Sequence, residues 1–276
     1  MKLNLLFGFF PFLCFVLFSC DSNIATGDNT NMDYINIWSM PQEKEITVSE
    51  GTITVVLIAT GNYCNVYYDK NISLPSEKRL KQIVYNYDKG YEKVTSFLGL
   101  YEKGGGPGGN GGGDSDLRIQ TYIYDLYPAG GRFSTYNGES VYIDIYNIDG
   151  STFTHELCHL IYYGNYSASP ENWYHEFLPI TSDYVFHGTI PDWTIPNVEL
   201  FKGWISGGGT DSWPYYNTYR KLAKYLVDKY GNTILYELYH QNAINKQALE
   251  NVLATRSVTL SSVELDFQKW CNNYGR

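Results

Sequence analysis

The chain has 276 residues and a formal net charge of −9 at pH 7, and 18% of its residues are charged. This length suffices for one large domain or two small ones, and the 27 tyrosines argue against intrinsic disorder. The acidic balance leaves no basic footprint for nucleic acid, so a nucleic-acid partner is disfavoured.

The N-terminus reads MKLNLLFGFFPFLCFVLFSC. Lys2 precedes an apolar run, residues 5–18, that has the length of a secretory signal and is too short for a comfortable membrane span. A cysteine ends this segment and polar residues follow at once. The segment (1–20) therefore resembles a bacterial lipoprotein signal, which implies acylation of Cys20. The alternative is an ordinary cleaved signal with an incidental cysteine.

Both interpretations predict export to the bacterial cell envelope or surface. The lipoprotein resemblance implies that the lipid on Cys20 is the only attachment to a membrane. Residues 21–32 are polar and are expected to form a flexible tether.

Three cysteines remain if Cys14 is removed with the signal and Cys20 is lipidated. An odd number excludes a full disulfide framework. Cys158 is expected to be a small buried hydrophobe. Cys64 and Cys271 are candidates for a disulfide, which the sequence leaves open.

Residues 45–71 alternate β-branched and aromatic side chains and predict two or three strands, with turns near Gly51 and Gly61. A helix is expected next, because apolar side chains recur at helical spacing over residues 80–98. Ser76 is a suitable N-cap for that helix.

The run GGGPGGNGGG, residues 104–113, predicts a flexible loop. It lacks the Lys-Ser/Thr pair that ends a phosphate-binding P-loop. Asp114 and Asp116 follow directly, and carboxylates this close together could hold a calcium ion.

Two further segments, 116–128 and 139–149, read as strands on either side of the turn-rich residues 128–138. Helices are then expected over 151–163, over 173–186 and in three patterns within 215–274. The first of those three patterns ends at Gly231, as a helix does when glycine occupies the C′ position. Strands followed by helices indicate an α+β fold.

The segment THELCH, residues 154–159, contains two histidines four positions apart. On a helix, His155 and His159 lie on one face and can bind the same metal ion. Glu156 is turned from His155 by about 100°, where it can reach a metal-bound water. Chance produces this three-letter pattern in on the order of one chain in a hundred of this length, so context decides. Apolar residues at 153, 157, 160 and 161 make the segment a credible helix.

A catalytic zinc needs a third protein ligand and an open position for water. The next helical segment begins at Trp173 and contains two candidates, His175 and Glu176. The order of motifs here resembles the gluzincins, metallopeptidases that pair an H-E-x-x-H helix with a W-x-x-E helix, matched by WYHE. More narrowly it resembles the hyicolysin family of neutral zinc metallopeptidases, from residue 46 to about residue 272.

The resemblance implies a zincin-like fold with one catalytic zinc bound by His155, His159 and Glu176. It implies a catalytic part over residues 33–187, with β-structure before the motif helix, and a helical C-terminal subdomain over 188–276. The match departs from the family at position 180, where gluzincins often carry an acidic residue.

Asp183 is the nearest acidic substitute on that helix face and could orient a zinc ligand by a hydrogen bond. Pro179 predicts a kink or a late helix start, because proline removes a backbone hydrogen bond.

The mechanism that follows uses zinc to acidify a water and to polarise the scissile carbonyl. Glu156 would take the proton of the water and pass it to the leaving amine. Tyr216 and His240 are candidates for the donor that stabilises the oxyanion. The strand around 140–147 could line the cleft and pair with an extended peptide, or it could be an edge strand protected by Asp144.

The sequence thus favours an exported zinc metallopeptidase that acts on peptides or proteins. Two alternatives remain: a cell-surface binding lipoprotein that keeps the fold without catalysis, and a zinc hydrolase of a non-peptide or cell-wall substrate. A binding protein would be indicated by loss of Glu156 or of a zinc ligand, and neither is lost.

Overall fold

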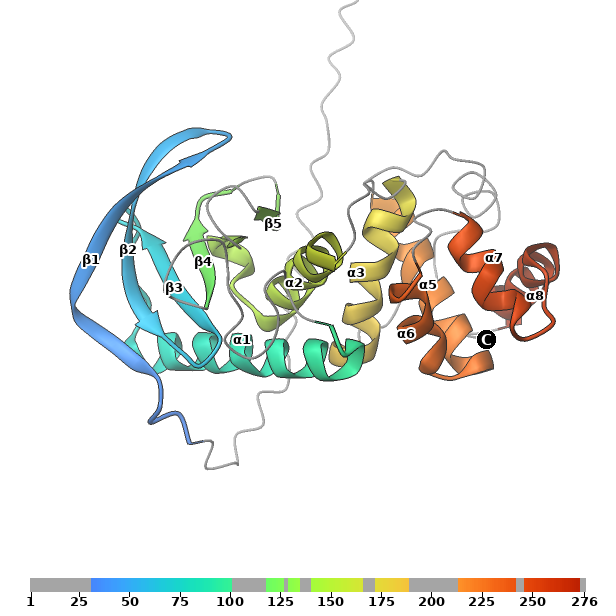
Figure 1. Cartoon of the computed structure of the whole chain (residues 1–276). Helices are drawn as coiled ribbons and strands as arrows, with labels where there is room; N and C mark the ends of the chain where they lie inside the picture. The colour runs from blue at the N-terminus through green and yellow to red at the C-terminus, as the bar shows by residue number, and fades with distance from the viewer. Residues whose placement is uncertain are drawn as a thin grey trace, which may run out of the picture. The chain divides into compact units, whose positions relative to one another are not determined.

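The strands form one mixed sheet, and α1 runs along one face of it (Figure 1). The computed structural model describes residues 31–100, 118–126, 129–134, 140–165, 172–188, 213–241 and 246–273, without the side chains of residues 41, 164, 172–175, 182–185 and 213–215. Contacts separate Met1–Asn31 from Met32–Arg276, which forms a single compact unit. A domain boundary after residue 187 stays a prediction.

Six strands make up the sheet, in the order β1-β2-β3-β4-β6-β5. Their bounds are β1 (Asn36–Val48), β2 (Gly51–Thr60), β3 (Cys64–Asp69), β4 (Ile119–Tyr124), β5 (Gly131–Ser134) and β6 (Ser140–Asp144). β4 is parallel to both β3 and β6, and the other neighbours are antiparallel. The strands predicted within 45–71, 116–128 and 139–149 are confirmed, whereas β5 lies in a segment that was predicted to be turns.

The helices follow the predicted order. Their bounds are α1 (Glu77–Leu98), the 3₁₀ turn η1 (Ile145–Asn147), α2 (Gly150–Asn165), α3 (Asn172–His187), α5 (Trp213–Tyr230), α6 (Thr233–Tyr239), α7 (Lys246–Ala254) and α8 (Leu260–Asn273). The described residues from 213 to 273 thus form four helices where three were predicted. Among the described residues, no helix has the length and apolar character of a membrane span.

Local capping explains where α1 begins and where α1 and α5 end. The hydroxyl of Ser76 accepts a hydrogen bond from Arg79 N at 3.4 Å, which confirms Ser76 as the N-cap. Gly99 follows α1 with φ 60°, and Gly231 follows α5 with φ 81°. Each donates its N–H to a carbonyl of the last turn, which satisfies an otherwise unpaired acceptor.

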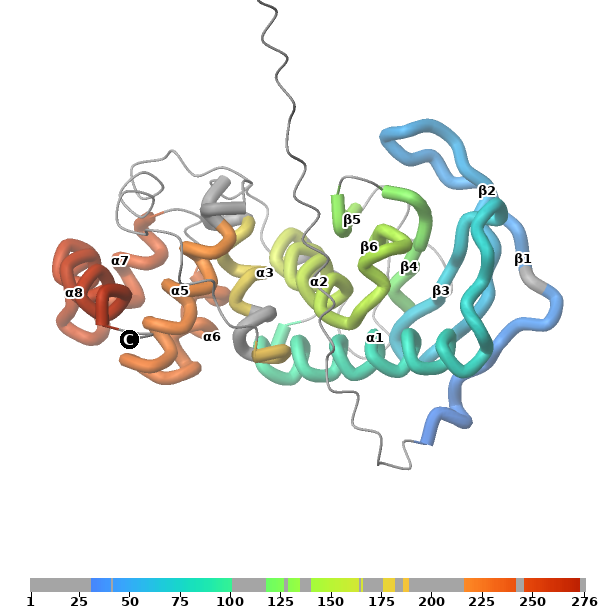
Figure 2. Tube along the Cα trace, turned by 180° about the vertical axis from the view of Figure 1, so that it is seen from behind, coloured from blue at the N-terminus to red at the C-terminus, as the bar shows by residue number. Residues whose placement is uncertain are grey.

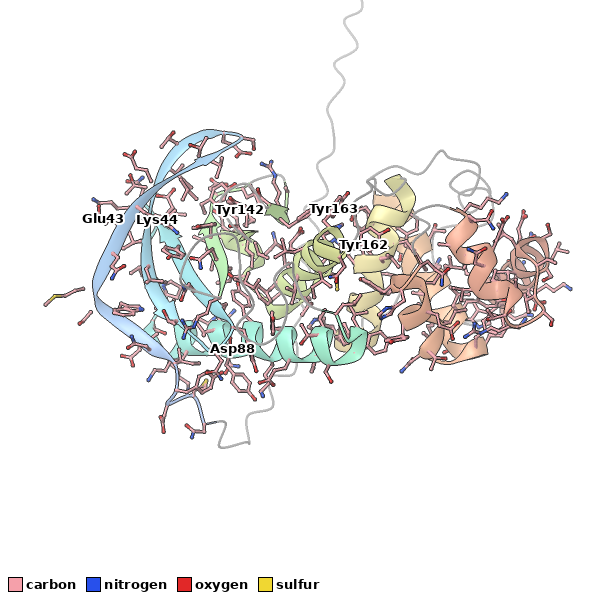
Figure 3. The ribbon with its side chains drawn as sticks, viewed as in Figure 1. Glu43, Lys44, Asp88, Tyr142, Tyr162 and Tyr163 are labelled. Atoms are coloured by element: carbon pink, nitrogen blue, oxygen red, sulfur yellow. The ribbon has the colours of Figure 1, made fainter. Side chains whose placement is uncertain are left out.

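The two faces of the sheet support separate hydrophobic clusters because side chains alternate along a strand. In β4, Ile119 and Ile123 join the large cluster formed with the helices. Tyr122 joins a smaller cluster on the opposite face, where its ring lies 5.2 Å from the rings of Tyr67 and Tyr142. The ammonium of Lys44 on β1 lies 4.1 Å from the centroid of the Tyr67 ring. Tyr142 and Lys44 are both labelled in Figure 3.

The tip of the β1–β2 hairpin reaches the far end of the sheet. Beyond the last pair with β3, the hairpin continues to a turn at residues 49–50 and curls over the sheet, as Figures 1 and 2 show. Glu50 Oε1 there lies 2.7 Å from Arg132 Nη1 of β5, and Ser49 Oγ accepts a hydrogen bond from the same nitrogen. The hairpin therefore closes the sheet face that carries the tyrosines.

Cys64 and Cys271, whose pairing the sequence left open, are both free cysteines. Cys64 is buried at the start of β3, where its Sγ lies 3.6 Å from Asp88 Oδ1, whereas Cys271 is half-buried on α8. Cys158 is 1% exposed within the core, as predicted for a small hydrophobe.

A buried carboxylate fastens α1 to the sheet. Asp88, labelled in Figure 3, is 1% exposed and accepts hydrogen bonds from Asn62 N at 2.8 Å and Tyr63 N at 2.9 Å. Gly61 passes so close that a Cβ there would lie 2.4 Å from Asp88 Oδ2. Burial raises the pKa of Asp88, and the hydrogen bonds oppose that rise only in part.

We expect Asp88→Ala to lower the free energy of unfolding by about 2–4 kcal/mol at pH 4, because it removes the buried acceptor of two partly buried backbone N–H groups. The deficit should shrink as the pH rises toward 7. The pKa of Asp88 is higher in the folded state than the value of about 3.9 expected in the unfolded state. The stability of the wild type therefore falls as the pH rises through these two pKa values. The variant has no carboxyl at this position, so its stability does not fall for this reason. Urea unfolding at both pH values measures this.

The matched control is Asp228→Ala on α5, whose partner Lys224 lies 3.0 Å away one turn back. An ion pair of this kind contributes roughly 0.3–0.5 kcal/mol, so the free energy of unfolding of the control variant should change little. Equal losses in the two variants would contradict a special role for Asp88.

Candidate metal centre

The helix α2 is capped and apolar as the motif requires. Asp149 Oδ1 accepts a hydrogen bond from Thr152 N at 3.0 Å, which satisfies a donor of the first turn. The predicted apolar face is confirmed, because the side chains at positions 153, 157, 160 and 161 are at most 1% exposed. The motif face is covered as well, since Glu156 is 7% and His159 3% exposed.

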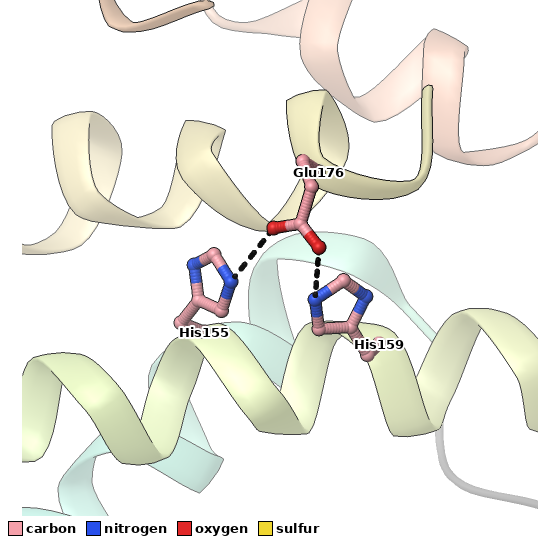
Figure 4. Close-up of side chains that lie close together, drawn as sticks. All are labelled: His155, His159 and Glu176. Carbon is pink, nitrogen blue, oxygen red and sulfur yellow. Dashed lines mark ion pairs between the residues drawn. The ribbon is translucent and has the colours of Figure 1, made fainter. Parts of the chain in front are cut away.

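Three side chains from two helices converge at this face of α2 (Figure 4). His155 Nε2 lies 3.4 Å from Glu176 Oε2, and His159 Nε2 lies 3.7 Å from Glu176 Oε1. The potential ligand atoms of all three residues lie within 4.8 Å of one another.

This donor set fits a zinc ion. Ligand atoms about 2.0–2.2 Å from a tetrahedral zinc lie about 3.3–3.6 Å apart, close to the separations between Glu176 and the two imidazoles. Two imidazole nitrogens and one carboxylate also match the ligand types of catalytic zinc sites. His155, His159 and Glu176 could therefore hold a metal ion.

Glu176 is ionised at neutral pH. Burial raises its pKa, but the hydrogen bond to His155, the charges of His159 and His155, and a hydrogen bond from Tyr216 outweigh burial and lower the pKa to about 2. The carboxylate is thus ready to bind a cation without first losing a proton.

The helix α3 carries Glu176 in its second turn. It begins at Asn172 and continues through Pro179, so the predicted late start is wrong. The side chains of His175 and Asp183 lie outside the described residues, and their predicted roles stay untested. A further link joins the helices: Thr154 Oγ1 of α2 lies 2.8 Å from His187 Nε2 at the end of α3.

Glu156 lies under the strand β5. A Cβ on Gly131 would be 2.8 Å from Glu156 Oε1 and 2.9 Å from its Cγ, so only glycine permits this approach without a shift. Phe133 on the same strand stacks on His159, with ring centroids 5.0 Å apart. Neither Gly131 nor Phe133 was a predicted site residue, although a glycine pair before Arg132 and Phe133 is typical of a strand that passes close to another element.

The position of β5 corrects the assignment of the edge strand. The strand β6 lies between β4 and β5, so it cannot be the strand that an extended peptide joins. Among the described strands, β5 is the edge strand of the sheet on the side that contacts α2. Asp144 does not protect an edge either: it is 3% exposed and accepts hydrogen bonds from Leu126 N and Tyr146 N.

The two candidate oxyanion donors are in different places. Tyr216 of α5 hydrogen-bonds Glu176, and its ring centroid is 6.5 Å from that of His155. His240 follows α6, where its Nε2 lies 2.8 Å from Leu98 O at the end of α1. The structure therefore brings only Tyr216 to the metal ligands. The possible calcium ligands Asp114 and Asp116, and the lipidation candidate Cys20, lie outside the described residues.

No protein-family model matches the sequence, and neither does any curated protein. Among solved structures, the chain is similar to a mutant M1 zinc metallopeptidase from Deinococcus radiodurans, with a TM-score of 0.41 and 8% identity. The match covers 88% of this chain and 62% of that one, so the chain spans less than two thirds of that protein. Likeness this low assigns neither a fold nor an activity.

Proposed function

We propose that the protein is a zinc-dependent metallopeptidase of the gluzincin type with a zincin-like fold. The observation that carries the proposal is the convergence of His155, His159 and Glu176 at the spacing of zinc ligands. Glu156 lies one residue from a ligand on the same helix, as the hydrolytic H-E-x-x-H arrangement requires. Neither a binding protein nor a structural metal site needs this glutamate.

A zinc ion held by the three residues would supply Lewis acidity for a water and for the scissile carbonyl. Glu156 accepts a proton from the attacking water and delivers it to the amine that leaves. Tyr216 donates a hydrogen bond to the oxygen that becomes negative as the carbonyl is attacked. The substrate peptide lies in extended form along β5 and gains backbone hydrogen bonds there.

The test is metal analysis and hydrolysis with the purified protein. We expect one zinc per chain and cleavage of casein that a chelator abolishes and added zinc restores. Zinc binding without cleavage of casein or of a peptide library would favour the binding lipoprotein or a hydrolase of a cell-wall substrate. Hydrolysis of muropeptides would then indicate the hydrolase, and its absence the binding protein. A folded protein that takes up no zinc would contradict the proposal.

Replacing Tyr216 by Phe should lower kcat by about 10²–10³-fold, the usual effect of removing one oxyanion donor. Zinc affinity should fall as well, by up to about 10–100-fold, because Tyr216 also hydrogen-bonds the proposed ligand Glu176. The rates are therefore compared at saturating zinc, where the Michaelis constant should change little. Steady-state kinetics with a fluorogenic peptide measure the effect. Tyr236→Phe on α6, where the side chain is 41% exposed, is the control and should retain full activity.

We also propose that the protein is exported and anchored through a lipid on Cys20. The support is the N-terminal sequence alone, in which an apolar run ends in LFSC. Mass spectrometry of the mature N-terminus is the test, since an unmodified N-terminus after Cys20 would favour the ordinary signal. The anchor would hold the catalytic residues near the membrane surface on the tether 21–32.

A further inference from the structure

One strand contacts two of the motif residues of α2. Side chains alternate along β5, so Gly131 and Phe133 face α2 while Arg132 faces the hairpin tip at Glu50. Gly131 lies against Glu156, and Phe133 lies against His159. The strand therefore contacts both the proposed base and a proposed metal ligand.

The contact between Phe133 and His159 is an offset, nearly parallel stack. The ring centroids are 5.0 Å apart and the planes meet at 17°. The Phe133 ring also stacks on that of Tyr163, with centroids 5.1 Å apart and planes at 29°. Phe133 thus stacks on two rings of α2, the imidazole of His159 and the phenol of Tyr163.

This stack restricts the rotation of the imidazole. The final torsion of a histidine side chain has a broad preference, so the covalent structure alone does not hold the ring plane. A flat partner in parallel contact opposes rotation, because turning the imidazole would drive its edge into the phenyl ring. The observed plane points Nε2 of His159 at Glu176 Oε1, 3.7 Å away.

The other proposed histidine ligand, His155, has a different aromatic environment. The ring of Tyr216 lies 6.5 Å from that of His155, and the two imidazoles meet nearly edge to face, at 75°. His155 is also the more exposed of the two, with 15% of its side chain accessible against 4% for His159. The stacking contact of β5 described above is thus made with His159, the less exposed of the two imidazoles.

We infer that Phe133 is a positioning residue that holds His159 in the orientation of a metal ligand, so that β5 sets the affinity of the site for zinc. This inference rests on the proposed zinc site. Groups that orient metal ligands typically contribute a factor of about 10–100 to metal affinity. The same strand is the proposed place of the substrate, and thus peptide binding and metal geometry share one element.

The experiment compares zinc dissociation constants, measured by competition with a chromogenic chelator, for the wild type, Phe133→Ala and Phe133→Leu. Leucine keeps the site filled with apolar volume but lacks a flat face, which separates ring stacking from general stability. We expect both variants to bind zinc about 10–100-fold more weakly. Phe133→Tyr, which keeps the ring, should bind like the wild type, and only the Ala and Leu variants should show a changed visible spectrum after Co²⁺ substitution.

Phe97→Ala is the matched control, because Phe97 is also a half-buried ring, packed edge-on against Phe186 on other helices. Unchanged zinc affinity in Phe133→Leu, or an equal loss in Phe97→Ala, would overturn the positioning role while leaving the metallopeptidase proposal intact. A wild-type protein that binds no zinc would overturn both.

Discussion

Glu156→Gln should lower peptide hydrolysis by about 10²–10⁴-fold while one zinc stays bound to each chain. The amide has nearly the shape of the carboxylate but cannot accept a proton from the attacking water at neutral pH. Gln also fits the space beneath Gly131, which lies against the Glu156 side chain and leaves no room for a larger group. The ligands themselves are untouched, and metal content should not change.

Single-turnover kinetics and metal analysis on the same preparation measure both expectations. Glu77→Gln on α1 is the control, since that side chain is 66% exposed and pairs with Lys81 far from the motif in sequence. The assignment of the base fails if Glu156→Gln keeps more than about a tenth of the wild-type rate with zinc bound, a loss below the usual contribution of a general base.

Removing a ligand should abolish stoichiometric zinc binding. His159→Ala and Glu176→Gln each leave two of three protein ligands, and we expect zinc affinity to fall by more than the roughly 100-fold that loss of an orienting group can cause. Hydrolysis should disappear with the metal. His159→Ala also leaves Glu176, 8% exposed, without one of its two imidazole partners.

Thermal unfolding with and without zinc provides a second readout. Zinc at about 1,000 times its dissociation constant stabilises the folded wild type by about 4 kcal/mol and should raise its Tm, whereas the ligand variants should not respond. His240→Ala is the control: it removes a histidine bonded to Leu98 O and should retain both zinc and its stabilisation. A ligand variant with full zinc content would show that other residues bind the metal.

Much of the local structure was predictable because it depends on neighbouring residues. Ser76 accepts a hydrogen bond from a backbone N–H three positions later, and Gly231 takes the left-handed conformation that ends a helix. Apolar residues at helical spacing predicted α1 and α2, and alternation predicted β2, β3 and β4.

The errors concern elements whose identity depends on distant partners. The strand β5 has four residues and a glycine at its start, and its pairing with β6 makes it a strand. The position of β6 inside the sheet follows from that same pairing. His240 suited an oxyanion donor by residue type alone, but packing of α6 against the end of α1 placed it on Leu98 O.

The sequence by itself determined the geometry within α2: two imidazoles one turn apart and a glutamate beside them follow from 3.6 residues per turn. Only the tertiary structure decided that Glu176 lies within reach of both imidazoles, that Phe133 stacks on His159 and that Gly131 lies over Glu156. Helical periodicity relates residues a few positions apart. The distance between two helices, or between a strand and a helix, depends on side-chain packing among segments remote in the chain, and no local pattern encodes it.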